Sequence, residues 1–234
     1  MAEKDVIIAC DFSTLEETMQ FLQKFSDEKP YVKIGMELFY GEGPKVVKEI
    51  KAMGHKIFLD LKLHDIPNTV ARAAAQLAKM GVDMTNVHAA GGSIMMAAAL
   101  DAIQQAGANT KLIAVTQLTS TSEQLMHDEI LVCPSIDMKT AVAKYAQNAK
   151  SSGLAGVVCS PLEAAEIKEV CGADFLTVTP GIRFEDDAKG DQVRVTSPRD
   201  ARAASDYIVV GRSITASDNP VAAYTRCVND FLGE

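Results

Sequence analysis

Short apolar runs and amphipathic stretches alternate along the whole chain. The apolar runs are rich in β-branched residues, and the stretches between them, such as 68–81 and 93–107, have the spacing of amphipathic or alanine-rich helices. Continuous apolar strands that alternate with helices are typical of parallel sheets covered by helices, so the pattern predicts repeated β–α units. The predicted strands are residues 6–12, 31–36, 56–62, 84–89, 111–118, 156–160, 175–182 and 207–214.

The number of these units favours a closed α/β barrel. Eight units in 234 residues predict a (β/α)8 TIM barrel that spans residues 1–234 as a single domain. The main alternative is an open doubly wound sheet, but the stretch CDFSTLEE at 10–17 lacks a Gly-rich dinucleotide fingerprint. No linker or low-complexity tract interrupts the pattern. Residues 119–136 form a longer connection, of the kind that often serves as a lid or binding loop.

The composition indicates a globular protein with an acidic surface. Hydrophobic residues make up 47% of the chain, and the formal net charge is −8. This charge argues against general affinity for nucleic acid or anionic membranes. An anionic ligand would therefore have to bind at a local basic cluster.

Cysteine and histidine usage gives no sign of a metal site. The cysteine count is odd and no two cysteines have a metal-type spacing, so we expect buried free thiols in a reducing cytosol. The four histidines also lack metal-ligand spacing. Since the chain shows no apolar signal region and no membrane-length run, we expect a cytoplasmic protein. The cysteines are Cys10, Cys133, Cys159, Cys171 and Cys227.

Charged residues gather where the predicted strands end. In a barrel, the carboxyl ends of the strands and the loops after them build the active site. Asp11 ends the first predicted strand, Lys33 lies on the second, and Asp60 and Lys62 end the third. Residues two apart share one face of a strand, so Asp60 and Lys62 are predicted to point together toward the barrel mouth. Leu59, Leu61 and Leu63 would then face the helices.

Each of these charges also has a purely structural interpretation. Asp60 and Lys62 could form a structural ion pair, although barrel interiors are normally filled by branched apolar side chains. Asp65, in the stretch HDIPNTV, could make an Asx-type turn, and Asn68 or Thr69 could cap the next helix. Considered alone, Lys33 could be a functional or a structural residue. The same is true of Asp11, which could belong to the start of the following helix.

A second cluster suggests a phosphate site. Loops after the seventh and eighth strands of such barrels commonly bind phosphate through backbone N–H groups and a nearby cation. Arg183 and Arg212 follow these two strands, and two guanidinium groups can hold a phosphate dianion. A helix is predicted to start at Ser217 or Asp218. The acidic loop 184–195 either closes over a bound phosphate with Gln192 as a contact or is solvated.

Several motifs together resemble one enzyme family. DLKLHDIPNTV at 60–70 resembles the D-x-K-x-x-D signature of orotidine 5′-phosphate decarboxylases, in their bacterial form. VKIGMELF, VTQLTS, VTPGIR, GDQ and VVGRSIT resemble other motifs of that family, so the resemblance runs from Asp11 to Arg212. The signature alone is shared with metal-dependent sugar-phosphate enzymes, whereas the IPNTV, PGIR and GDQ stretches are more specific.

The resemblance implies an activity and a role for each residue. The implied reaction is the cofactor-free decarboxylation of orotidine 5′-phosphate to uridine 5′-phosphate in de novo pyrimidine biosynthesis, by a homodimer with shared active sites. Lys62 would protonate C6, Asp60 would lie beside the substrate carboxylate, and Asp65 would come from the other subunit. Lys33 would complete the charged array. The substrate-binding residues would be Asp11, Lys33, Asp60, Ile66, Thr69, Thr119 with Ser120 nearby, Arg183, Gln192, Gly211 and Arg212.

Three other functions remain open at this point. A metal-dependent sugar-phosphate decarboxylase or aldolase would use the same aspartates to hold a divalent cation. A Schiff-base aldolase would use Lys62 or Lys33, but adjacent carboxylates favour the ammonium form, which is a poor nucleophile. A non-catalytic nucleotide-binding barrel would keep the fold without the reaction.

Overall fold

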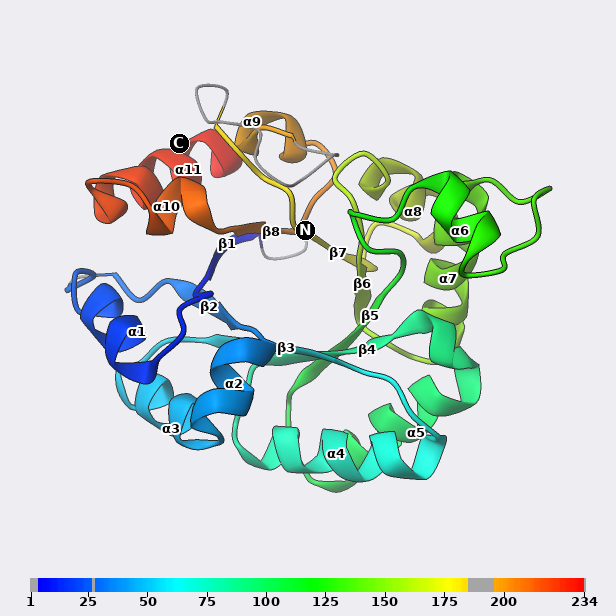
Figure 1. Cartoon of the computed structure of the whole chain (residues 1–234), viewed down its shortest axis with the longest axis horizontal. Helices are drawn as coiled ribbons and strands as arrows, with labels where there is room; N and C mark the ends of the chain where they lie inside the picture. Colours follow the sequence, from blue (N-terminus) through cyan, green and yellow to red (C-terminus); the bar gives the residue numbers. More distant parts are fainter. Residues whose placement is uncertain (1–3, 27, 185–195, 234) are drawn as a thin grey trace.

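The predicted barrel is confirmed. The computed structural model describes residues 4–26, 28–184 and 196–233. Its strands run in chain order around one closed parallel barrel, which Figure 1 shows inside a ring of helices. Closure is visible at Ile7, which pairs with Tyr31 on one side and Val209 on the other. The strands are β1 (Asp5–Ala9), β2 (Tyr31–Ile34), β3 (Ile57–Leu63), β4 (Met84–His88), β5 (Lys111–Val115), β6 (Gly156–Val158), β7 (Leu176–Thr179) and β8 (Tyr207–Val210).

Helices fill the connections between the strands. The long connection predicted after the fifth strand contains a short helix of its own, which Ser122 caps by accepting a 3.1 Å hydrogen bond from the Leu125 N–H. The helices are α1 (Leu15–Leu22), α2 (Met36–Glu42), α3 (Lys45–Ala52), α4 (Pro67–Lys79), α5 (Gly92–Gln105), α6 (Glu123–Asp128), α7 (Met138–Ser151), α8 (Ala164–Cys171), α9 (Pro198–Ala201), α10 (Arg212–Thr215) and α11 (Pro220–Leu232), with a 3₁₀ turn η1 (Ala89–Gly91).

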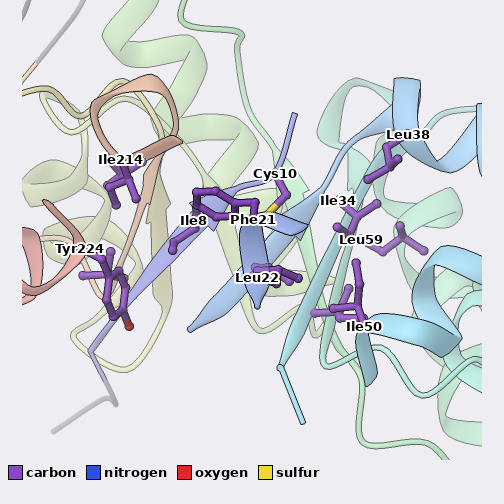
Figure 2. Packing of buried hydrophobic residues seen from close by; sticks show 14 of the residues in the cluster. Ile8, Cys10, Phe21, Leu22, Ile34, Leu38, Ile50, Leu59, Ile214 and Tyr224 are labelled. Atoms are coloured by element: carbon purple, nitrogen blue, oxygen red, sulfur yellow. The ribbon is translucent and has the colours of Figure 1, made fainter. Parts of the chain in front are cut away.

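Alternation along the strands divides the apolar side chains between two cores. Phe58 belongs to the small cluster inside the barrel, whereas its neighbour Leu59 belongs to a cluster between strands and helices. Figure 2 shows part of this outer core, in which Leu59 and Ile50 of α3 take part. Leu61 is also in the outer core and Leu63 packs against it, as the alternation predicted. The inward-facing positions of β3 are therefore left for Phe58, Asp60 and the residues at the mouth.

One predicted helix start is wrong, and one proposed helix cap is not formed. The helix after β8 begins at Arg212 instead of Ser217 or Asp218, and the next begins at Pro220 with Asn219 as its cap. Helix α4 begins at Pro67 with Ile66 at the N-cap position, so neither Asn68 nor Thr69 caps it. Pro suits the first position of a helix because it has no N–H to leave unsatisfied.

The cysteines are free, and four of them are buried as expected. Cys133 is exposed, so the expectation of a buried thiol is wrong there. It lies in the loop between α6 and α7. Within the described residues, none of the helices has both the length and the apolar character to cross a membrane.

A buried ion pair stabilises the end of the barrel opposite the carboxyl ends of the strands. Asp206, which immediately precedes β8, is 5% exposed and pairs with Lys168 of α8. The Asp206 carboxylate also accepts a 2.8 Å hydrogen bond from the Thr177 N–H. Removing one partner of a buried pair leaves an uncompensated charge. We expect Asp206→Ala to lower the free energy of unfolding by about 3–5 kcal/mol in urea titrations, without changing the activity of the folded protein.

A surface pair provides the matched control. Asp230 pairs with Arg199 at 3.3 Å, but the Arg199 side chain is 77% exposed. Because water screens such pairs, Asp230→Ala should cost less than about 1 kcal/mol. Equal losses from the two variants would contradict the stabilising role given to the buried pair.

Candidate active site

The four charged residues predicted to converge do so in a continuous chain. The Lys33 ammonium lies 2.8 Å from an Asp11 oxygen and 3.8 Å from Asp60 Oδ2. The other oxygen of Asp60 lies 2.8 Å from the Lys62 ammonium. Asp60 thus lies between two cations at the carboxyl ends of β2 and β3. Charges alternate along this array, which compensates for their removal from water.

Lys33 is held as a cation. Its side chain is 12% exposed. Desolvation by burial lowers its pKa, but the nearby carboxylates of Asp11 and Asp60 outweigh this effect, so that the pKa lies above its ordinary value. An ammonium group with a raised pKa is a poor amine nucleophile at neutral pH, which disfavours Lys33 as a Schiff-base residue.

The end of β3 departs from a regular strand at Lys62. Its φ is +50°, in the left-handed region that residues other than glycine seldom adopt. Around it the pairing with β4 shifts: Leu59 is opposite Thr85, but Leu63 is opposite Val87. Such irregularities are common beside active sites, where they redirect a side chain. The shared orientation of Asp60 and Lys62, predicted from simple alternation, is therefore produced by a distorted strand end.

Sequence reasoning missed Asn86, which lies opposite this distortion on β4. Asn86 is fully buried. Its Nδ2 donates a 2.7 Å hydrogen bond to Asp60 Oδ1, and its Oδ1 accepts a 2.8 Å hydrogen bond from the Lys62 N–H. A polar residue on the same strand face as the inward Met84 was the available signal.

Gly35 was also missed, and it makes room for the Asp11–Lys33 pair. A Cβ at this position would lie 3.2 Å from the Asp11 carboxylate oxygen and 3.4 Å from the Lys33 ammonium. The contact with Asp11 is tighter than most Cβ contacts in proteins, so a larger residue would require the Asp11 carboxylate to shift by a few tenths of an ångström. The stretch VKIGM contained this glycine, but its need for space depends on a side chain from another strand.

Two adjoining cavities open at this mouth. One, of about 220 Å³, is lined by Lys33, Asp60 and Lys62 together with Thr119 and Ser120. The other, of about 390 Å³, has Lys33, Pro180 and Val209 in common with the first. Its remaining lining residues are Ala9, Asp11, Gly181, Arg183, Gly211, Arg212 and Thr215. The arrangement suits an elongated ligand with a small polar ring at one end and an anionic group at the other.

The two predicted arginines line the same cavity. Arg183 follows β7, and Arg212 is the first residue of α10 after Gly211 at the end of β8. The predicted cluster of two guanidinium groups and a glycine backbone is thus brought together. Gln192, predicted to contact a phosphate, lies outside the described residues.

Three predicted site residues do not join the cluster within one chain. Asp65, Ile66 and Thr69 are exposed around the start of α4. The Asp65 carboxylate accepts a 2.6 Å hydrogen bond from the Ile66 N–H, which is the local turn contact considered as its structural alternative. Ile66 is 66% exposed, which is high for a large apolar side chain.

The described residues do not form a recognisable metal-binding site. Among them, no group of three or more His, Cys, Asp and Glu side chains is arranged to hold a metal ion. The position between Asp11 and Asp60 is instead occupied by the Lys33 ammonium, and the Lys62 ammonium lies on the other side of Asp60.

Comparison with known sequences gives a consistent match. The protein-family model described as "Orotidine 5′-phosphate decarboxylase / HUMPS family" matches residues 4–227 of this chain. A protein of Bacillus cytotoxicus named orotidine 5′-phosphate decarboxylase is 56% identical over 235 residues, covering 98% of each chain. A protein of the same name from Fusobacterium nucleatum is 55% identical over 230 residues, covering 98% of this chain and 96% of the relative.

Solved structures agree with the sequences. The crystal structure of orotidine 5′-phosphate decarboxylase from Lactobacillus acidophilus has a TM-score of 0.87 and 43% identity, covering 98% of this chain and 99% of that one. An uncharacterized conserved protein from Geobacillus kaustophilus has a TM-score of 0.86 and 47% identity, covering 97% and 99% of the two chains. Fold and sequence therefore point to the same group of proteins.

Proposed function

The chain belongs to the orotidine 5′-phosphate decarboxylase / HUMPS family, and we propose that this enzyme converts orotidine 5′-phosphate to uridine 5′-phosphate without a cofactor, as a step of pyrimidine biosynthesis. The observation that carries the cofactor-free proposal is the charged array. Asp60 lies between the ammonium groups of Lys33 and Lys62 at the mouth of the barrel. The array supplies electrostatic stabilisation from the protein's own groups.

Lys62 is the proposed proton donor. When the bond from C6 of the pyrimidine to the carboxylate breaks, carbon dioxide leaves and the electron pair remains on C6. The ring offers that pair little delocalisation, so a fixed cation nearby lowers the energy of the transition state. The Lys62 ammonium then gives its proton to C6, and the neutral amine regains a proton from solvent.

Asp60 acts on the ground state and on Lys62. Placed beside the substrate carboxylate, it repels that carboxylate and raises the energy of the bound substrate more than that of the transition state, in which the charge has moved to C6. Its 2.8 Å contact also fixes the Lys62 ammonium in place. Lys33 and Asp11, which line the cavity toward the arginines, hold the ribose.

The second cavity holds the phosphate. Arg183 and Arg212 line it together with Gly211, whose backbone can approach an anion closely. We assign Gln192 to the same group. Binding energy from this remote phosphate keeps the substrate in place while the reacting end is desolvated. Thr119 lines the other cavity and would contact the base.

The remaining site residues come from a second subunit in this proposal. Asp65, Ile66 and Thr69 are exposed on the isolated chain, so they are free to reach the site of a homodimer partner. Asp65 would then extend the array beyond Lys62 with another carboxylate. The proposal treats residues 1–234 as one barrel domain that acts on a free nucleotide in the cytoplasm.

A direct assay tests the cofactor-free reaction. With excess chelator present, we expect the ultraviolet absorbance of orotidine 5′-phosphate to disappear at the same rate as without it. Turnover that requires an added divalent cation would instead support a metal-dependent sugar-phosphate enzyme of the same family. Tight binding of uridine 5′-phosphate with no turnover in either condition would support a nucleotide-binding barrel.

A further inference from the structure

We propose that Asn86 is a positioning residue, which sets the Asp60 carboxylate and the Lys62 backbone in the geometry that the reaction requires. The proposal rests on the proposed function and adds to it a residue that lines neither of the two cavities. Asn86 lies behind the array on β4, fully buried, and is absent from the lining of both cavities.

Asn86 makes one contact with each of the two reacting residues. The amide nitrogen donates to the Asp60 oxygen that also accepts from the Lys62 ammonium, at 2.7 Å and 2.8 Å. The other Asp60 oxygen lies 3.8 Å from the Lys33 ammonium. Because Asp60 faces a cation on each side, these cations alone do not fix its rotation. The neutral donor of Asn86 holds one oxygen toward Lys62 and leaves the other toward Lys33.

The second contact supports the unusual backbone at Lys62. The backbone groups of β3 alternate sides, since the Lys56 carbonyl accepts from the Val32 N–H of β2 and the Ile57 carbonyl accepts from the Asp83 N–H beside β4. In a regular strand the Lys62 N–H would therefore face β2. At the distorted end of β3 it turns to β4 instead, where the side-chain oxygen of Asn86 accepts its hydrogen bond at 2.8 Å. A buried N–H without an acceptor is costly, and a φ of +50° is costly for lysine. Asn86 thus stabilises the conformation that directs the Lys62 side chain to the mouth.

A single amide performs both tasks because it has a donor and an acceptor on one rigid plane. An apolar residue of similar size would satisfy neither Asp60 nor the Lys62 N–H. An aspartate would keep the acceptor, but its ionised form would place a second carboxylate against Asp60. These two losses can be separated by two substitutions.

The first variant is Asn86→Leu. We expect kcat to fall by about 100-fold, because displacement of reacting groups by about 1 Å has an effect of this size. The dissociation constant for uridine 5′-phosphate should change by less than about 3-fold, since the phosphate cavity lies away from Asn86. An unchanged kcat would overturn the proposal, as would equal losses in kcat and in nucleotide binding.

Thr85→Val is the matched control. Thr85 is also fully buried on β4, and its hydroxyl donates a 2.9 Å hydrogen bond to the Leu59 carbonyl of β3. It belongs to the same pair of strands, but its hydroxyl bonds to backbone and not to a side chain of the array. We expect it to lower the urea midpoint while kcat stays within about 2-fold. A loss of kcat equal to that of Asn86→Leu would show that any damage to these strands has the same effect.

The second variant, Asn86→Asp, has a side chain of nearly the same shape. Its activity should depend on pH in a way that a role of residue 86 in packing alone would not produce. The introduced carboxyl shares a proton with Asp60, so its ionisation is displaced to higher pH, although Lys62 and Lys33 oppose part of this displacement. Protonated, it can donate as the amide does. We expect the ratio of the variant's activity to that of wild type to increase at least about 10-fold as the pH is lowered from 8 to 5.5. His88 of β4 and His64, whose ring stacks on it with centroids 5.6 Å apart, are nearby titratable groups, and both are present in both proteins.

Carbon-13 NMR of the carboxyl groups makes the test independent of turnover. In Asn86→Asp, a titration shared by two carboxyls should appear and follow the recovery of activity. If wild type shows no turnover, the proposed function fails, yet this shared titration still reports whether position 86 contacts Asp60. Two independent titrations, or a flat activity ratio over this pH range, would overturn the positioning role.

Discussion

Lys62→Ala is expected to lose at least about 10⁴-fold in kcat/KM for orotidine 5′-phosphate. A general acid contributes about 10²–10⁴-fold and a fixed electrostatic group about 10²–10³-fold, and Lys62 is proposed to act as both. Binding of uridine 5′-phosphate should change little by comparison, because the two arginines line a different cavity. Steady-state kinetics and product titration separate the two quantities. A loss confined to KM would show that Lys62 binds the substrate without donating the proton.

Lys51→Ala is the control for removing a paired lysine from this fold. Lys51 of α3 lies 2.9 Å from Asp83, immediately before β4 at the opposite end of the barrel, and its side chain is 33% exposed. Asp83 keeps a 2.7 Å hydrogen bond from the Ile57 N–H after the substitution. We expect kcat/KM to remain within about 2-fold of wild type, since partly exposed pairs contribute at most about 1 kcal/mol. A large loss here would mean that barrel integrity, and not proton donation, limits the Lys62 variant.

The barrel was predictable because its signal is repeated eight times. Each strand is a short apolar run that is covered on both faces, and that burial leaves a pattern in the local sequence. The convergence of Asp11, Lys33, Asp60 and Lys62 followed from the same reasoning, since strand ends of one barrel meet at one rim. The two arginines at the ends of β7 and β8 followed likewise.

The features that escaped prediction depend on contacts between different strands. The left-handed backbone of Lys62 occurs where the pairing with β4 shifts, and the side chain of the buried Asn86 accepts a hydrogen bond from its N–H. The Lys62 backbone has no local signature, because a single strand does not reveal its register against its neighbour. Asn86 is recognisable from sequence only as a polar residue on the inward face of β4, and its two partners depend on the same register. Gly35 is similar, since the side chain it accommodates comes from β1. The misplaced start of α10 reflects a short helix without a side-chain cap at Gly211.

Asp65 is expected to act in trans, and mixing two inactive variants would demonstrate it. Lys62→Ala and Asp65→Ala should each be nearly inactive as pure proteins. If a site combines Lys62 of one subunit with Asp65 of the other, each mixed dimer contains one complete site and one site lacking both residues. Random exchange makes half of the dimers mixed, so about a quarter of all sites should regain wild-type activity. Against the expected background of each variant, this is a recovery of roughly 10³-fold.

The exposed start of α4 is the structural reason to expect this outcome. Asp65 and its neighbours Ile66 and Thr69 lie outside the cavities of their own chain, and a 66% exposed isoleucine is suited to burial in an interface. Subunit exchange has to be confirmed separately, with differently tagged chains captured together. Exchange without recovery would place Asp65 in its own subunit's site or outside the reaction. The 2.6 Å turn contact with Ile66 would then be the whole role of its carboxylate.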